Sequence, residues 1–526
     1  MRRLLFLWLA ALVLLGGAAQ AATDEYGVAT GQVERWGTYE IALDGPRDGN
    51  PFLDVDLAAT FRQGLREIAV DGFYDGDGRY KIRFMPDTVG QWEYTTRSNR
   101  PALNAKTGRF TVVAPARGNH GPVAVHNTFH FAYADGTPFW QVGTTSYAWL
   151  HQSAQSQEQT LQTLAGAPFN KLRMAIFPNN DVPLPDQRFP FVGTPPHNWD
   201  FERFDPAFFR NLDRRVAQLR DKGIEADLIL FHPYDKGKWG FDRMPGAVND
   251  RYLRYVIARL AAYRNVWWSM ANEFDLMKEK RMDEWDHYFK LVQAGDPYGH
   301  LRSIHHSVRL YNYTQPWVTH ASLQQGAAVE DPERAVIYRD VYEKPVVFDE
   351  VKYEGNIDRR WGQLTAEEMV LRFWNGAIAG SYVGHSEIFK DTDSRSWLGK
   401  GGTLRGRSAP RIAFFRKILE QSPQEGLEPI DKWQEHPFAG RHAEYYLGYF
   451  NRARPTAWPF VLFKTGLQDG MRFRAEVIDT WNMTVTPVDG IFTIRKRDDY
   501  TFADQDGRAI ALPGRPYMAV RIIRVR

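Results

Sequence analysis

Two glutamates stand where apolar runs give way to polar residues. Glu273 follows the run Val266–Ala271 and Asn272, and Glu350 is the last residue of the run Pro345–Glu350. Both runs have the length and the aromatic or β-branched content of buried strands. Paired carboxyls suit acid–base chemistry, and a glycosidic bond in particular needs one acid for the leaving oxygen and one carboxylate to attack or to activate water.

The segments that carry these glutamates belong to a longer alternation of short apolar runs and amphipathic stretches. Helical stretches are predicted at Pro206–Lys222, Arg251–Arg264 and Thr365–Ala379, the last with a capping box of Thr365 and Glu368. Eight strands are predicted between them, at Phe139–Trp149, Lys171–Phe177, Ala226–His232, Val266–Ala271, Arg302–His306, Val318–Leu323, Pro345–Glu350 and Ser381–His385.

Eight strands with helical crossovers predict a (β/α)8 TIM barrel. A doubly wound sheet is the structural alternative, but no glycine-rich phosphate loop follows the first strand. In a barrel the active site lies at the carboxyl ends of the strands, so Glu273 on strand four and Glu350 on strand seven are expected to face one another. A single glutamate at a strand end is usually a surface carboxylate, and it is the joint placement that indicates catalysis.

The chain has 526 residues, a length that predicts several domains. Together with the strand and helix patterns, it predicts a multidomain α/β plus all-β protein. We expect a signal peptide at residues 1–21, an N-terminal β-sandwich at 22–116, the barrel at 117–425 and a C-terminal β-sandwich domain at 426–526. Short alternating strands occur on both sides of the barrel, and no low-complexity linker separates the three parts.

The first residues follow the order of a secretory signal. Arg2 and Arg3 precede the apolar run Leu4–Leu15, and small residues end at Ala21, where we expect cleavage. The run is too short for a spanning helix, so the mature protein is expected to have no membrane span and to be periplasmic or extracellular. A retained N-terminal anchor is the alternative.

Composition excludes several classes of function. The chain has no cysteine, which rules out disulfides, catalytic thiols and thiolate metal sites. Lys and Arg number 66 against 63 Asp and Glu, and loss of Arg2 and Arg3 would leave 64 against 63. This near-neutral balance gives no support to nucleic acid or an anionic membrane as partner.

The two glutamate motifs resemble those of clan A of the retaining glycosidases. Within it, Phe139–Thr145, Ala271–Glu273 and Asp349–Gly355 are similar to the apiosidase-like group of provisionally assigned glycoside hydrolases, in which the barrel often follows a β domain of unknown function. The resemblance implies that Glu273 is the general acid/base and Glu350 the nucleophile.

The same resemblance gives roles to neighbours of the two glutamates. Asn272 would bind the sugar hydroxyl beside the anomeric carbon, and Arg173 would hold Glu350 charged, with a salt bridge in the barrel base as the alternative for Arg173. Glu354 is the competing nucleophile, although its position before a glycine favours a loop cap. Asp349 points to the other face of its strand, which favours a structural hydrogen bond.

Other polar and aromatic side chains lie near predicted strand ends and are candidates for sugar binding. They are His232, His306, His320, His385, Tyr147 and Trp149. Imidazoles also bind zinc, but no HExxH motif occurs and recognition of sugar hydroxyls accounts for the same residues. We therefore expect neither a metal nor a cofactor.

Taken together, these residues predict an exported retaining glycoside hydrolase acting on a polysaccharide or oligosaccharide through a two-glutamate double displacement. The alternative is a non-catalytic carbohydrate-binding or scaffold protein on the same barrel, because fold alone does not determine function. Neither the sugar, its linkage, endo or exo action, nor an oligomeric state is predicted.

Overall fold

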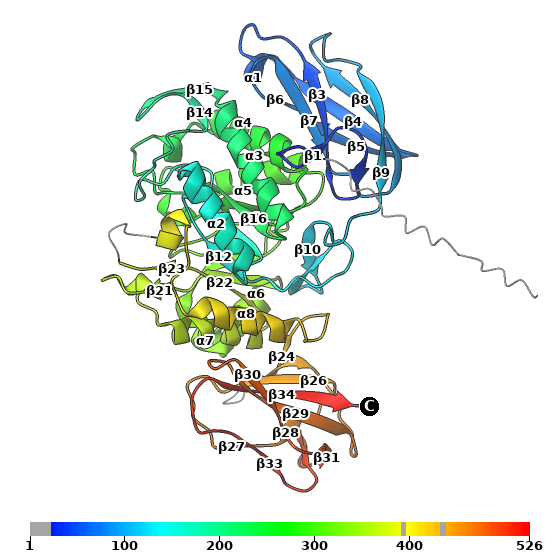
Figure 1. Ribbon diagram of the computed structural model, residues 1–526, viewed down its shortest axis with the longest axis vertical. Coiled ribbons are helices and arrows are strands. Elements are labelled where there is room, and N and C mark those ends of the chain that lie inside the picture. The colour runs from blue at the N-terminus through cyan, green and yellow to red at the C-terminus, as the bar shows by residue number, and fades with distance from the viewer. Residues whose placement is uncertain (1–22, 391–395, 432–437) are drawn as a thin grey trace, which may run out of the picture.

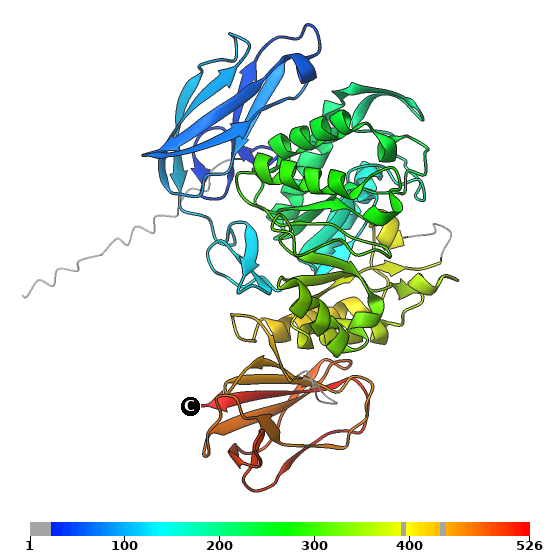
Figure 2. The same cartoon turned by 180° about the vertical axis from the view of Figure 1, so that it is seen from behind.

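The computed structural model describes residues 23–390, 396–431 and 438–526. Three parts follow one another along the longest axis: an N-terminal β domain, a helix-clad barrel and a C-terminal β domain (Figure 1). The view from behind shows the same order (Figure 2). The predicted signal peptide lies outside the described residues, and no helix within them is long and apolar enough to cross a membrane.

The N-terminal domain is a sandwich of two sheets around an aromatic core. Phe61, Phe84 and Trp92 are completely buried between the sheets. One sheet has the order β1 (Val28–Ala29), β3 (Thr38–Asp44), β7 (Arg79–Phe84) and β6 (Phe73–Tyr74). The other has the order β2 (Val33–Glu34), β9 (Thr107–Val113), β8 (Gly90–Ser98), β4 (Leu57–Gln63) and β5 (Arg66–Asp71).

The central part is an eight-stranded parallel barrel, as predicted. Its strands, in spatial order, are β18 (Arg302–Ser303), β17 (Val266–Ala271), β16 (Glu225–Phe231), β13 (Lys171–Ala175), β12 (Gly143–Thr145), β22 (Tyr382–His385), β20 (Val346–Glu350) and β19 (Ala321–Gln324). A parallel bridge between His305 and Ser322 closes the ring. Several strands are shorter than predicted, and Trp149 belongs to a 3₁₀ turn at Trp149–His151 rather than to β12.

Seven helices of the barrel region cover the outside of the strands. They are α2 (Ala154–Gly166), α3 (Pro206–Asp221), α4 (Gly246–Leu260), α5 (Met282–Gly295), α6 (Pro332–Tyr342), α7 (Ala366–Ile378) and α8 (Ser408–Leu419). The predicted apolar stripe of α3 is buried, and Asp205 caps its first turn. Thr365 caps α7 by accepting from the Glu368 N–H at 3.2 Å.

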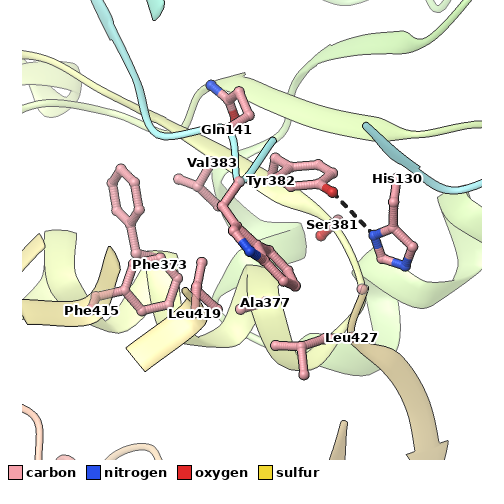
Figure 3. A pocket seen from close by; sticks show the side chains of 12 residues that line it. His130, Gln141, Phe373, Ala377, Ser381, Tyr382, Val383, Phe415, Leu419 and Leu427 are labelled. Carbon is pink, nitrogen blue, oxygen red and sulfur yellow. Dashed lines mark hydrogen bonds between the residues drawn. The ribbon is translucent and has the colours of Figure 1, made fainter. Parts of the chain in front are cut away.

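The amino ends of the barrel strands are closed by a hairpin of β10 (Val123–His126) and β11 (His130–Tyr133). Phe131 of this hairpin packs on Trp267 inside the barrel. The His130 ring lies 3.0 Å from the Tyr382 hydroxyl (Figure 3) and 2.8 Å from Glu428 of the C-terminal part. The hairpin thus joins the barrel floor to the next domain.

The C-terminal domain is built on one continuous path of hydrogen-bonded strands rather than the two separate sheets expected for a sandwich. The path runs through β24 (Glu428–Asp431), β25 (Phe438–Arg441), β26 (Tyr445–Tyr449), β34 (Met518–Val525), β29 (Arg472–Asp479), β31 (Phe492–Lys496), β32 (Thr501–Asp504) and β28 (Val461–Phe463), with β30 (Thr484–Pro487) beside β29. The outer strands share one apolar core, so the sheet curls into a barrel-like form.

A buried ionic network fastens the N-terminal domain to the barrel helices. Asp213 of α3 lies 2.9 Å from Arg83 of β7 and 2.8 Å from Arg259 of α4. Arg259 also pairs with Asp75 at 2.8 Å, and Arg83 with Glu40 at 2.8 Å. Positive and negative charges alternate in this buried interface. Each charge has lost its hydration and is stabilised by its oppositely charged neighbours instead.

We predict that Asp213→Asn lowers the free energy of unfolding by about 3–5 kcal/mol, because two buried guanidinium groups lose their shared counter-charge. Calorimetry and urea unfolding would measure the loss. Asp221→Asn is the control, since the Asp221 side chain is 61% exposed beside Arg220 and should contribute less than about 1 kcal/mol. Equal effects of the two variants would contradict the importance assigned to the network.

Candidate active site

A pocket of about 200 Å³ opens at the carboxyl ends of the barrel strands. Both predicted glutamates, Glu273 and Glu350, contribute to its wall. The other lining residues are Tyr147, Asn179, Asp181, Val182, Tyr234, Gln324, Tyr353, Trp361, Leu398 and Gly399. The barrel topology brings these residues together from loops that are more than 200 residues apart in sequence, as the C-terminal face of a TIM barrel does.

Glu350 at the end of β20 is surrounded by donors. Tyr147 and Tyr353 both donate to its carboxylate, Tyr353 at 2.6 Å. His305 lies 3.4 Å and Arg173 Nη1 3.7 Å from Glu350 Oε1, which agrees with the prediction of a cation beside this residue. Burial by itself would raise the pKa of Glu350, but His305, Arg173 and Tyr147 together lower that pKa to about 2.

Glu273 has a different environment. Its backbone has a φ of +45°, in the left-handed region that non-glycine residues rarely adopt, directly after β17. Burial and the negative charge of Glu350 raise the pKa of Glu273, while a hydrogen bond from Tyr234, at 2.8 Å, opposes the increase. The two carboxyls in this pocket are therefore shifted in opposite directions.

Arg173 connects the two halves of the pocket floor. Its Nη1 faces Glu350, and its Nη2 donates to Asn272 Oδ1 at 2.7 Å. Asn272 Nδ2 in turn donates to the Tyr234 hydroxyl at 2.5 Å. Asn272 is completely buried and stands below the pocket wall. The chain from Arg173 through Asn272 to Tyr234 therefore sets the direction of the hydroxyl that reaches Glu273.

A second layer of charges lies deeper in the barrel. Lys171 donates to Asp227 at 2.9 Å and to Asp349 at 2.7 Å, and Ser322 donates to Asp349 at 2.5 Å. The prediction that Asp349 has a structural role is confirmed by these contacts. Glu354 also lies away from the pocket, where it accepts from the backbone N–H groups of Arg407 and Ser408 at the start of α8.

Seven of the eight residues that we expected to bind substrate do not line the pocket. Two of them, Asn272 and Arg173, are buried in the hydrogen-bonded chain described above, and the remaining five make other contacts. His320 was expected near the carboxyl end of a strand, but it stands just before the first residue of β19. Its ring packs against Trp267 near the closed end of the barrel. The others face the protein interior because their ring atoms contact neighbouring backbone or side chains: His232 with Phe177, His306 with Tyr313, His385 with Thr144 and Trp149 with Gln157. Tyr147 lines the pocket as expected.

Sequence reasoning missed the roles of Tyr234, Gln324 and Tyr353. Tyr353 stands three residues after Glu350, and Tyr234 stands two residues after the predicted third strand. Their positions in loops after strand ends were a signal, because those loops form the active site of a barrel. Their orientation towards a particular carboxylate was not encoded in any local pattern.

The arrangement offers two carboxyls in one pocket, one with a lowered and one with a raised pKa, and a difference in this direction suits acid-assisted displacement at an acetal carbon. Among the described residues, the single group of three or more clustered His, Asp or Glu ligands is Glu354, His385 and Glu387, outside this pocket.

Comparisons with solved structures show which proteins this chain resembles. A solved structure from Bacteroides vulgatus, provisionally described as a glycoside hydrolase, is 42% identical, has a TM-score of 0.90 and covers 94% of this chain and 100% of its own. A family 5 glycoside hydrolase from the same species shares the fold, with 14% identity, a TM-score of 0.57 and coverage of 77% and 93%. No curated protein matches the chain.

Family models match all three parts of the chain. Domains of unknown function, DUF5060 and DUF5605, match residues 32–99 and 433–523. The model described as "Apiosidase-like, catalytic domain" matches residues 125–421, more than half of the chain and the whole set of barrel strands. The chain therefore belongs to the apiosidase-like family.

Proposed function

We propose that this chain is an exported retaining glycoside hydrolase that cleaves a glycosidic bond of a polysaccharide or oligosaccharide. The observation that supports this most strongly is the pair Glu273 and Glu350, which share one pocket and have pKa values shifted in opposite directions. A binding protein has no physical need for this difference in protonation, whereas double displacement depends on it.

In the first step, the ionised Glu350 attacks the anomeric carbon and the bond to the leaving oxygen breaks. Glu273 transfers its proton to that oxygen, and a glycosyl ester of Glu350 forms. The hydrogen bonds from Tyr147 and Tyr353 keep the attacking carboxylate oriented. They also stabilise the carboxylate when it becomes the leaving group of the second step.

In the second step, the Glu273 carboxylate accepts a proton from water while the water oxygen attacks the anomeric carbon. The ester bond to Glu350 breaks and the sugar leaves with its original configuration, since two inversions cancel. Glu273 regains its proton and Glu350 its charge, so the site returns to its starting state. Tyr234 contacts Glu273 throughout, and its hydrogen bond stabilises the ionised form.

The outer wall of the pocket is suited to a carbohydrate. Trp361 is partly exposed there, and an indole face can stack on the apolar side of a sugar ring. Asn179 and Asp181 add polar groups to the lining, with Asp181 paired to Lys236 at 2.6 Å. The pocket is smaller than the roughly 300–1,000 Å³ typical of ligand sites, which suits a short part of the substrate.

We predict that Glu350→Ala abolishes turnover. In Glu273→Ala, kcat on natural substrates should fall by about 10²–10⁴-fold, but substrates with an activated leaving group should still be cleaved. Azide should accelerate Glu273→Ala with retained configuration and give inverted product with Glu350→Ala, as followed by NMR of the glycosyl azide.

The matched control for this pair is Glu225→Gln, because Glu225 is also a buried glutamate but lies at the amino end of β16. It should keep wild-type activity on both substrate types. Equal losses in the two alanine variants without azide rescue would contradict the proposed roles, and inverted product from the wild type would exclude retention.

The pH dependence of kcat/KM tests the role of Glu273, because the direction of its shift in a variant can be stated in advance. Activity requires a protonated Glu273, so kcat/KM should fall as pH rises through the raised pKa of Glu273. Tyr234→Phe removes the hydrogen bond that favours the ionised form, so the pKa of Glu273 should increase further and the alkaline limb should move to higher pH. If the alkaline limb of the kcat/KM profile stays in place or moves to lower pH in Tyr234→Phe, the assignment of Glu273 as the acid is wrong.

Export is proposed from the first residues of the chain, with a periplasmic or extracellular location. The mature protein is expected to begin at Ala22, since the small residues before it fit a cleavage site. Fractionation of a bacterial expression host and intact-mass measurement would test this. A protein that stays in the membrane fraction at its full mass of 60.6 kDa would indicate a retained anchor instead.

A further inference from the structure

Three side chains with metal-binding atoms gather behind the wall of the pocket. Glu354 of β21 (Glu354–Gly355) and Glu387 of β23 (Glu387–Ile388) stand opposite each other in a short parallel pair, and His385 ends the neighbouring β22. One ligand atom from each of the three lies within 4.8 Å of the other two. The two short strands are visible beside one another in Figure 1.

The cluster is buried and includes an unsatisfied nitrogen. His385 and Glu387 have no exposed surface, and Glu354 is 4% exposed. The Nδ1 of His385 lies 3.1 Å from the Thr144 hydroxyl, whereas its Nε2 is buried with no hydrogen-bond partner in the described parts of the chain. A buried imidazole nitrogen without a partner costs free energy unless something binds to it.

The two carboxylates are oriented from one side by a run of backbone donors. Glu387 accepts from the N–H groups of Arg405 and Gly406, at 2.6 and 2.8 Å. Glu354 accepts from those of Arg407 and Ser408, at 2.7 and 3.1 Å. The Ser408 hydroxyl also donates to Glu354 Oε2, which therefore accepts two hydrogen bonds. Glu354 Oε1 and the two Glu387 oxygens each accept one of these backbone hydrogen bonds and keep a further lone pair for a ligand bond.

Two carboxylates buried side by side repel one another, and a low-dielectric environment strengthens the repulsion. Either a shared proton or a bound cation can relieve it. A shared proton would satisfy the two glutamates but would leave the His385 nitrogen without a partner. A cation bound by all three side chains would satisfy the imidazole nitrogen as well.

We propose that Glu354, His385 and Glu387 form a binding site for one divalent first-row metal ion, with Zn²⁺ or Mn²⁺ as the matching ions. An imidazole with two carboxylates suits these ions, whereas Ca²⁺ and Mg²⁺ prefer ligand sets made of oxygen alone. The three ligands would move inwards to metal distances of about 2.0–2.2 Å. The ion takes no part in the displacement at Glu350.

The proposed ion would stabilise one wall of the pocket. The chain runs from Glu387 past Leu398 and Gly399 to the donors at residues 405–408. The carbonyls of Leu398 and Gly399 accept from the N–H groups of Tyr147 and Ala148, at 2.8 and 2.9 Å. Fixing this segment at its far end would therefore restrain the backbone that carries Tyr147 to Glu350.

The test uses the mature, full-length protein without a metal-binding tag, after chelator treatment and dialysis. Zn²⁺, Mn²⁺ and Ca²⁺ are added separately, unbound metal is removed and bound metal is counted by mass spectrometry. The wild type should retain about one Zn²⁺ or Mn²⁺ per chain and no Ca²⁺. Hydrogen exchange at residues 396–408 should become slower in the metal-bound form.

Glu387→Gln and His385→Gln should each weaken Zn²⁺ binding at least about tenfold, whereas the buried control Glu225→Gln should bind as the wild type does. Melting curves and size-exclusion profiles establish that each variant is folded. If the wild type binds no metal, or a folded Glu387→Gln binds as tightly as the wild type, the proposal is wrong and a shared proton is the occupant. These readouts need no substrate and are independent of the proposed hydrolase activity.

Discussion

The structure around the pocket depends on one electrostatic constraint: two carboxyls, the buried Glu350 and the partly buried Glu273, share the same barrel mouth. Glu350 receives two tyrosine hydroxyls, a histidine and an arginine, which hold its pKa low. At Glu273, burial and the negative charge of Glu350 outweigh the donors Tyr234 and Gln324, and its pKa is raised. The opposite directions of the two pKa shifts thus arise from an unequal distribution of donors and charges, since burial raises the pKa of both carboxyls.

Maintaining that distribution requires a rigid frame. Inside the barrel, Lys171 joins Asp227 and Asp349 below the pocket, and Arg173 reaches both Asn272 and Glu350. Outside it, polar contacts dock both flanking domains on the barrel, through the buried Asp213 on one side and through His130 with the half-exposed Glu428 on the other. Such contacts fix the orientation of each flanking domain on the barrel, which apolar packing alone specifies less well. The pocket stays open to solvent.

Much of the fold could be predicted because its signals are local. The run Val266–Ala271 became β17 without change, and Glu350 ends β20 as expected. Predictions failed where a local signal was weak: α4 begins at Gly246, five residues before the predicted start, because it opens on a glycine and its N-cap, Pro245, makes no side-chain hydrogen bond. In the C-terminal domain the strands Ala443–Phe450, Met471–Asp479 and Tyr517–Val525 were located, but their joining into one curled sheet depends on pairings distant in sequence.

The sequence by itself determined the barrel and the two glutamates, because strand ends and residue types are local properties, and the family resemblance added the arginine beside Glu350. The tertiary structure decided which neighbours reach the pocket. His320 and Trp149 looked equivalent to Tyr147 in sequence, yet one lies at the closed end of the barrel and the other in the core. The physical reason is that the direction of a side chain after a strand depends on where the strand begins and how its loop turns, and long-range packing fixes both.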